Sequence, residues 1–140
     1  MEKQKILIVD DEVDMRNLLV ELLGKAGYEC KTAANGEEAI NEIEKDSFAL
    51  VLLDILMPIK GGLEILPRIL AKNKDTAVII ITGVVETKIA FDALKLGAYD
   101  YITKPFNIDE VMVSVEKAFE KRRLIIQNRE YQENLEKKVI

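Results

Sequence analysis

A run of apolar residues that ends in an acid, Ala49 to Leu53 followed by Asp54, constrains the fold of this chain most. Five residues are too few for a helix, and an unbroken apolar run is typical of a strand buried on both faces of a parallel sheet. Similar runs occur at Ile6–Val9 and Ala77–Ile81. Asp54 is therefore expected at the carboxyl end of a strand, where open α/β sheets bind ligands, although alone it could equally be a turn-forming or capping residue.

Amphipathic segments separate these runs. Their spacing predicts helices at 13–23, from 36, at 63–71, at 85–96 and from 108, and two further strands at 28–33 and 99–102. Strands that alternate with helices across short connections predict a parallel sheet with helices on both faces. We expect an α/β chain of the flavodoxin-like (βα)5 class, with a doubly wound parallel sheet of strand order 2-1-3-4-5 and an extended C-terminal helix.

Composition excludes several kinds of site. The 140 residues include no histidine and one cysteine, Cys30, so histidine-based metal sites, histidine-dependent triads and an internal disulfide are excluded. Charged residues from Glu2 onward leave no room for a signal peptide, and no apolar run approaches the roughly 18 residues that span a bilayer. We expect a cytoplasmic protein that makes no membrane contact.

Charge is unevenly distributed along the chain. Residues 1–118 hold 14 Lys and Arg against 21 Asp and Glu, whereas residues 119–140 hold six Lys and Arg against four Glu. An acidic surface repels the phosphates of nucleic acids. We therefore expect no direct nucleic-acid binding by residues 1–118.

Residues capable of chemistry follow four of the expected strands. Asp10 and Asp11 follow the first, Asp54 the third, Thr82 the fourth and Lys104 the fifth. In the expected strand order the first and third strands are neighbours, which brings three carboxylates into one crevice. Because carboxylates this close repel one another, a cation should bind among them, and Mg²⁺ suits such a set best.

Each of these residues also has an ordinary structural explanation. Lys104 could be a solvated lysine, and Thr82 could simply end its strand. The acids at 10–12 could stabilise the amino terminus of the following helix. Only their joint placement at one edge of the sheet favours a functional site.

The chain resembles, over about residues 4–120, the response-regulator receiver domains of two-component systems, including the chemotaxis regulators. The resemblance rests on four segments, each at the end of a strand: Val9-Asp-Asp-Glu12, Asp54-Ile-Leu-Met-Pro58, Ile81-Thr-Gly83 and Tyr101-Ile-Thr-Lys-Pro105. It implies a receiver that takes a phosphoryl group from a sensor histidine kinase in a Mg²⁺-dependent reaction. It also implies a protein that promotes its own phosphorylation and dephosphorylation without being a turnover enzyme.

The resemblance implies roles for the acidic residues. Asp54 is similar to the phosphoacceptor, whose carboxylate becomes an acyl phosphate. Asp11 and Asp54 would ligate Mg²⁺ together with the backbone carbonyl of Leu56. Asp10 would act mainly through a metal-bound water.

Roles for the remaining matched residues follow in the same way. Thr82 would hydrogen-bond a phosphoryl oxygen, and Lys104 would pair with Asp54 before transfer and with the phosphoryl group afterwards. Movement of Thr82 would let the ring of Tyr101 turn inward, which would reshape the surface of the fourth helix, fifth strand and fifth helix. The resemblance also implies a cis Lys104-Pro105 bond.

Four positions near the site differ from many receivers or bear on access. Leu56 and Val84 are apolar where many relatives carry polar residues that could position a water, so we expect slow loss of the phosphoryl group. Gly83 would leave the site open to a donor. Gly61 replaces an Asp found in many relatives, which puts the hydrogen bonding of that loop in doubt.

The C-terminal segment extends past the expected domain. Residues 107–140 contain no Gly or Pro and predict one helix that Asn107 caps, in which an imperfect heptad pattern is formed by Leu124, Asn128, Tyr131, Leu135 and Lys138. A solvated helical extension explains this pattern as well as a coiled coil does. We expect a receiver domain at 1–120 and, at 121–140, a helical linker or short coiled coil.

This linker would lead to an output domain outside the chain. The segments at 97–101, 122–124 and 134–135 resemble receivers that are joined to enhancer-dependent transcription activators or to cyclic-di-nucleotide phosphodiesterases. A homodimer could form through the surface of the fourth helix, fifth strand and fifth helix, or through the C-terminal helix.

Two other classes of function compete with this interpretation. A Mg²⁺-dependent phosphatase with an Asp nucleophile would need a second acid two residues after Asp54, where this chain has Leu56. A nucleotide- or flavin-binding module would need a phosphate-binding loop after the first strand, where the acids at 10–12 would repel a phosphate.

Overall fold

Strands and helices alternate along the chain. The computed structural model describes residues 3–55, 57, 61–83 and 87–139. Its elements are β1 (Lys5–Val9), α1 (Val13–Lys25), β2 (Glu29–Ala33), α2 (Gly36–Lys45), β3 (Leu50–Asp54), α3 (Gly62–Lys72), β4 (Ala77–Gly83), α4 (Thr87–Lys95), β5 (Asp100–Lys104) and α5 (Ile108–Val139). The predicted order of elements is confirmed.

All strand pairs are parallel, and the sheet has the order β2-β1-β3-β4-β5. The predicted fold class and strand order are therefore confirmed. β4 and β5 run further than their apolar cores indicated, because their pairing continues to Thr82 opposite Thr103 and Gly83 opposite Lys104. This extension makes both Thr82 and Lys104 part of the sheet.

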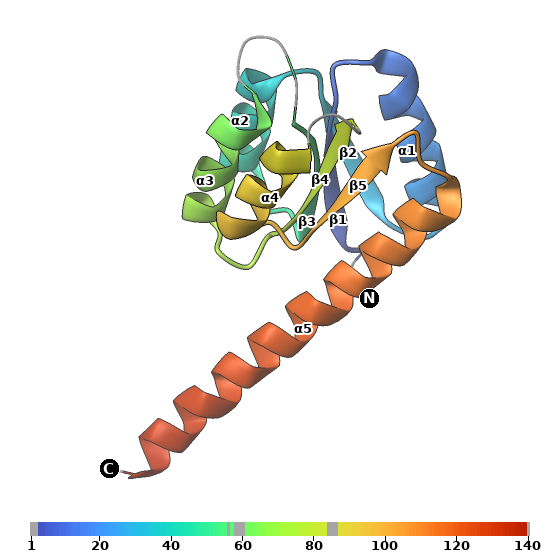
Figure 1. Ribbon diagram of the computed structural model, residues 1–140. Coiled ribbons are helices and arrows are strands. Elements are labelled where there is room, and N and C mark those ends of the chain that lie inside the picture. Colours follow the sequence, from blue (N-terminus) through green and yellow to red (C-terminus); the bar gives the residue numbers. More distant parts are fainter. Residues whose placement is uncertain (1–2, 56, 58–60, 84–86, 140) are drawn as a thin grey trace.

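Two hydrophobic cores lie on the two faces of the sheet. Figure 1 shows α2, α3 and α4 on one face and α1 and α5 on the other. Alternate strand residues turn to each face because successive side chains of a strand point in opposite directions. The first core includes Leu7, Val9, Val51, Leu53, Val78 and Ile80; the second includes Ile6, Ile8, Leu50, Leu52, Ile79 and Ile81. The carboxyl ends of the strands are thus held by packing on both sides.

The start of α5 is set by a side-chain cap. Asn107 Oδ1 accepts a hydrogen bond of 2.8 Å from the backbone N–H of Glu110, and Asn107 Nδ2 donates one of 3.2 Å to Glu110 Oε1. The predicted capping role of Asn107 is confirmed, and such caps satisfy N–H groups that the helix itself leaves unpaired. The cap starts α5 directly after the turn that follows Lys104.

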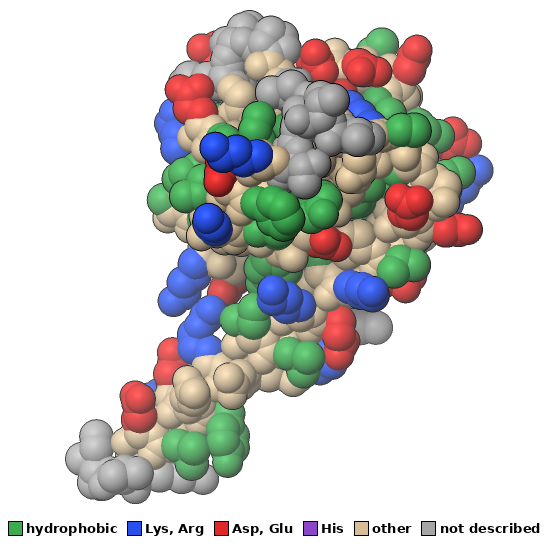
Figure 2. All heavy atoms as spheres, in the orientation of Figure 1, with side chains coloured by type: hydrophobic (Ala, Val, Ile, Leu, Met, Phe, Trp, Pro, Cys, Tyr) green, Lys and Arg blue, Asp and Glu red, His purple; other side chains and the backbone are tan. Residues whose placement is uncertain are grey.

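α5 continues as one helix to Val139 and extends well beyond the body of the molecule (Figure 1). Figure 2 shows separate hydrophobic side chains along this extension, between charged ones. Within the part of the chain that the structure describes, no helix is both long enough and apolar enough to cross a bilayer.

Candidate functional site

A lysine and several acids meet at the carboxyl edge of the sheet. Lys104 Nζ lies 3.5 Å from Asp54 Oδ2, 3.5 Å from Asp10 Oδ2 and 3.9 Å from Glu12 Oε1. These residues come from the ends of β5, β3 and β1, which are far apart in the sequence. Of the three acids predicted to share one crevice, Asp10 and Asp54 both lie beside the ammonium of Lys104.

The register of the strands places these residues. β1 and β3 are neighbours, with Val9 opposite Leu53, so the next residue of each strand is an acid at the same height. The backbone N–H of Asp10 donates to Ala33 O at 3.1 Å, which continues the pairing of β1 with β2. The backbone on both sides of the crevice is therefore part of the sheet and positions the acids accurately.

Asp10 carries a buried oxygen that accepts no hydrogen bond from the residues that the structure describes. The residue is 0% exposed, and its Oδ1 accepts a hydrogen bond of 2.9 Å from the backbone N–H of Glu12. Oδ2 accepts no hydrogen bond from the described residues, and Lys104 is its ion-pair partner. Because a buried carboxylate oxygen without a hydrogen bond is costly, and Lys104 is shared with Asp54, this oxygen fits a site that binds a cation.

Three consecutive acids group around this oxygen. One carboxylate oxygen from each of Asp10, Asp11 and Glu12 lies within 4.8 Å of the other two, and Asp11 and Glu12 are exposed. Carboxylate oxygens at this spacing suit a hard divalent cation such as Mg²⁺. Glu12 was not among the predicted ligands, although its position directly after Asp11 is a signal that could have included it.

Asp54 joins the site through Lys104 and is itself 5% exposed. It is not part of the group formed by residues 10–12. Leu56, whose carbonyl was predicted as a ligand, lies outside the described residues, as does Val84. A loop contact after Asp54 is described: the N–H of Gly62 donates to Ile55 O at 2.9 Å.

Gly62 permits this contact because it has no side chain. A Cβ at that position would stand 2.7 Å from Ile55 Cα and 3.0 Å from Asp54 O. Such distances are too short for any other residue. The amino terminus of α3 therefore packs directly against the backbone that carries Asp54.

Two opposing effects act on Lys104. Burial alone would lower the pKa of its ammonium, but the nearby carboxylates of Asp54, Asp10 and Glu12 together outweigh burial and raise the pKa above its ordinary value. Lys104 is therefore protonated at neutral pH in this crevice. The Lys104-Pro105 bond is cis, as predicted.

The two residues predicted to form a switch lie on neighbouring strands. Thr82 is 2% exposed, and its Oγ1 donates to Gly83 O at 3.3 Å. The half-buried ring of Tyr101 packs edge-on against Phe91, with 6.4 Å between ring centroids. The exchange of Tyr101 between two rotamers stays a prediction.

Arg16 is a site neighbour that sequence reasoning missed. Its Nη1 donates a hydrogen bond of 2.7 Å to the backbone carbonyl of Asp10. The guanidinium thus braces the turn that carries the acids of residues 10–12. A charged residue on the first helix has no distinguishing pattern in one sequence, so no signal was available to find it.

The comparisons with known proteins agree with this geometry. The family described as the response regulator receiver domain matches residues 6–116. The sporulation initiation phosphotransferase F of Bacillus subtilis is 41% identical over 117 residues, which are 84% of this chain and 94% of that protein. The C4-dicarboxylate transport transcriptional regulatory protein DctD of Rhizobium meliloti is 36% identical over 124 residues, 89% of this chain.

Solved structures give the same result. The receiver domain of NtrX from Brucella abortus has a TM-score of 0.79 and 37% identity, and the match covers 82% of this chain and 98% of that one. The chain spans 27% of the length of DctD and 30% of a longer NtrX structure. These similarities cover the described fold and the residues of the crevice.

Proposed function

This chain belongs to the response regulator receiver domain family, and on that premise we propose that Asp54 is its phosphoacceptor. As a member of the family it is a receiver of two-component signalling. The observation that carries the assignment of Asp54 is its position: a nearly buried carboxylate at the end of β3, with the ammonium of Lys104 at 3.5 Å.

The proposed reaction moves a phosphoryl group from a sensor histidine kinase. A carboxylate oxygen of Asp54 forms a bond to phosphorus while the phosphorus–nitrogen bond of the donor's phosphohistidine breaks, and the electron pair stays on the imidazole nitrogen. The product is an acyl phosphate. Lys104 pairs with Asp54 before transfer and with a phosphoryl oxygen afterwards, and Thr82 donates to another phosphoryl oxygen.

Mg²⁺ is the proposed cofactor. Asp10, Asp11, Asp54 and the backbone carbonyl of Leu56 would hold it, with Asp10 acting mainly through water. Bound Mg²⁺ would offset negative charge on the phosphoryl oxygens. The buried Oδ2 of Asp10, which accepts no hydrogen bond from the described residues, and the spacing of the acids at 10–12 support this assignment.

The receiver promotes its own modification and is not proposed to turn over a substrate. The phosphatase alternative is not favoured, because the relatives are response regulators and Leu56 stands where that class needs a second acid. Leu56 and Val84 would also slow hydrolysis of the acyl phosphate.

Phosphorylation is proposed to act on an output outside this chain. Thr82 and Tyr101 would shift the surface of α4, β5 and α5 between two states. We propose a receiver at 1–120 and a helical linker or short coiled coil at 121–140, with a homodimer through the C-terminal helix or through α4, β5 and α5. A cytoplasmic location, typical of the family, is also part of the proposal.

Intact-mass spectrometry tests the central assignment. The protein is incubated with Mg²⁺ and a small acyl-phosphate donor, alongside Asp54→Asn and the surface control Asp109→Asn. We expect one added phosphoryl group in the wild type and the control, none in Asp54→Asn, and none in any sample with a chelator. Full modification of Asp54→Asn would remove Asp54 from its proposed role.

A further inference from the structure

Two arginines of the α5 extension, which is the part of α5 from residue 121 onward, contact one acid of the receiver body, residues 1–120. Arg129 Nη1 donates to Asp75 Oδ2 at 3.0 Å and Nη2 donates to Asp75 Oδ1 at 2.6 Å. Arg122 Nε donates to the backbone carbonyl of the same residue at 2.6 Å. A two-pronged arginine–carboxylate contact is among the strongest and most directional that side chains make.

The body holds Asp75 firmly in the connection between α3 and β4. Its N–H donates to Asn73 Oδ1 at 2.9 Å, and the hydroxyl of the next residue, Thr76, donates to Phe48 O at 2.8 Å in the buried interior. The side chains of Asp75 and Arg129 are 23% and 32% exposed. Asp75 is therefore a fixed point two residues before β4.

The contact with Asp75 uses one face of α5, and the opposite face points away from the receiver body. Arg122 and Arg129 are seven residues apart and share a face, since a helix has about 3.6 residues per turn. By the same spacing, Leu124, Tyr131 and Leu135 point to the opposite side, and they are 50%, 64% and 44% exposed. An open groove of about 900 Å³ runs along part of this outer face.

Charge is partitioned between the two faces. In a heptad with Leu124, Asn128, Tyr131 and Leu135 at its seam, the flanking positions hold only uncharged residues: Ile125, Gln127, Gln132 and Asn134. Every charged residue between 122 and 137 falls elsewhere. The neutral face is therefore the stretch from Leu124 to Leu135, and two copies can meet there without placing like charges together. The next seam positions on either side are Lys121 and Lys138, so the uncharged contact ends at these lysines.

We propose that Asp75 is the anchor of the α5 extension: it grips the charged face through Arg122 and Arg129, and so presents the neutral face, in a fixed direction, to a second copy of the chain. This inference rests on the proposed homodimer. The receiver body stands on the gripped side of the helix, which leaves the neutral side open to the second helix.

The test uses Asp75→Asn, Arg129→Gln and, as a matched control on the same helix, Glu130→Gln. Amide hydrogen exchange in residues 122–133 is measured at a concentration where the protein is monomeric. We expect about fivefold faster exchange in the two anchor variants and no change in the control. A double variant that exchanges the two charges, Asp75→Arg with Arg129→Asp, should restore slow exchange.

Sedimentation equilibrium then tests the presentation of the neutral face. We expect dimer dissociation constants about fivefold higher in Asp75→Asn and Arg129→Gln than in Glu130→Gln. If amide exchange in residues 122–133 is unchanged in both Asp75→Asn and Arg129→Gln, Asp75 is not the anchor. If exchange is faster but the dimer dissociation constant is unchanged, Asp75 holds the helix but does not present its neutral face to a second copy.

Failure of the dimer itself has a different signature. A wild type that stays monomeric at every concentration removes the proposed dimer, while the exchange data still support or overturn the anchor. Exchange in the strands and phosphorylation at Asp54 serve as folding controls, since Asp75 lies at the opposite end of β4 from the crevice.

Discussion

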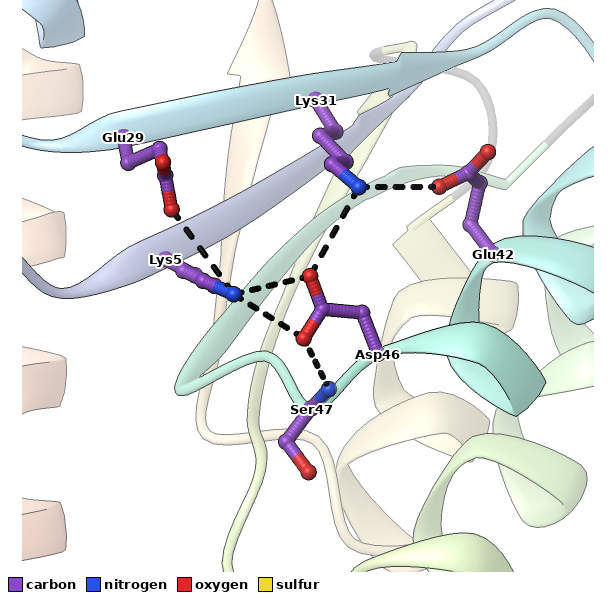
Figure 3. A network of polar contacts seen from close by, with 6 residues as sticks. All are labelled: Lys5, Glu29, Lys31, Glu42, Asp46 and Ser47. Carbon is purple, nitrogen blue, oxygen red and sulfur yellow. Dashed lines mark hydrogen bonds and ion pairs between the residues drawn. The ribbon is translucent and has the colours of Figure 1, made fainter.

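A cluster of lysines and acids lies at each end of the strands, one at the amino ends and one at the carboxyl ends, and the two differ in how closely their charges pair. At the amino edge, Lys5 Nζ donates to both oxygens of Asp46 at 3.0 and 2.9 Å, and Lys31 Nζ lies 3.6 Å from Asp46 and 4.0 Å from Glu42 (Figure 3). At the carboxyl edge, Lys104 approaches Asp10 and Asp54 no closer than 3.5 Å.

The two clusters also differ in burial and in how well their charges are paired. The side chains of Lys5 and Asp46 are 39% and 23% exposed, whereas those of Asp10 and Asp54 are 0% and 8% exposed. The exposed cluster is satisfied by its own hydrogen bonds. The buried one sets Asp10, Asp54 and Glu12 against the single ammonium of Lys104, so unbalanced negative charge lies where little water reaches it, which favours the binding of a cation.

The largest effect is expected from the shared lysine of the carboxyl edge. Lys104→Met keeps the apolar stem but leaves Asp10 and Asp54 without their ammonium, so the free energy of unfolding should fall by about 2–3 kcal/mol without Mg²⁺. Urea unfolding measures this, with the exposed Lys95→Met as control. An equal, small change in both variants would show that the carboxyl-edge cluster is as well satisfied as the amino-edge one.

Removing a buried acid should have the opposite sign. Asp10→Asn can keep the hydrogen bond from Glu12 while relieving repulsion, so we expect the free energy of unfolding without Mg²⁺ to rise by about 1 kcal/mol. The same variant should gain much less from added Mg²⁺. Thermal unfolding with and without Mg²⁺ measures both effects, and destabilisation in the absence of metal would contradict the proposed excess of charge.

A smaller effect is expected from the brace behind the acids. Arg16→Ala removes the hydrogen bond to the carbonyl of Asp10, and we expect Mg²⁺ to bind about fivefold more weakly because the turn is less well held. Calorimetric titration of Mg²⁺ measures the affinity. Arg16→Lys should recover part of it, and Arg68→Ala, on the exposed side of α3, serves as control.

The smallest effect concerns the amino edge and depends on pH. The hydrogen bond from Lys5, aided by the N–H of Ser47, lowers the pKa of Asp46 below its ordinary value of 3.8. The stabilisation is therefore present above that value and is lost as pH falls through the lowered pKa. Asp46→Asn should be slightly less stable than the wild type at pH 7 and equal to it in strong acid. A stability difference that stays constant with pH would argue against this contribution.

Much of the site could be predicted because strand ends are visible in the sequence. The apolar runs before Asp10 and Asp54 identify buried strands, and alternation with helices identifies a parallel sheet whose carboxyl ends share one edge. Lys104 was found in the same way. The roles of Arg16 and Asp75 were not predicted, because each depends on a tertiary contact that leaves no local pattern in the sequence.

The sequence by itself determined which segments are strands and helices and the edge at which the acids gather, since hydrophobic periodicity decides these features. The strand order came from the resemblance to receiver domains, because alternation of strands and helices is compatible with more than one order. Only the tertiary structure decided which oxygen of Asp10 accepts no hydrogen bond among the described residues, and that Arg122 and Arg129 bind one face of α5 to Asp75. Those outcomes depend on side-chain packing and rotamers, which the spacing of residues along the sequence does not determine.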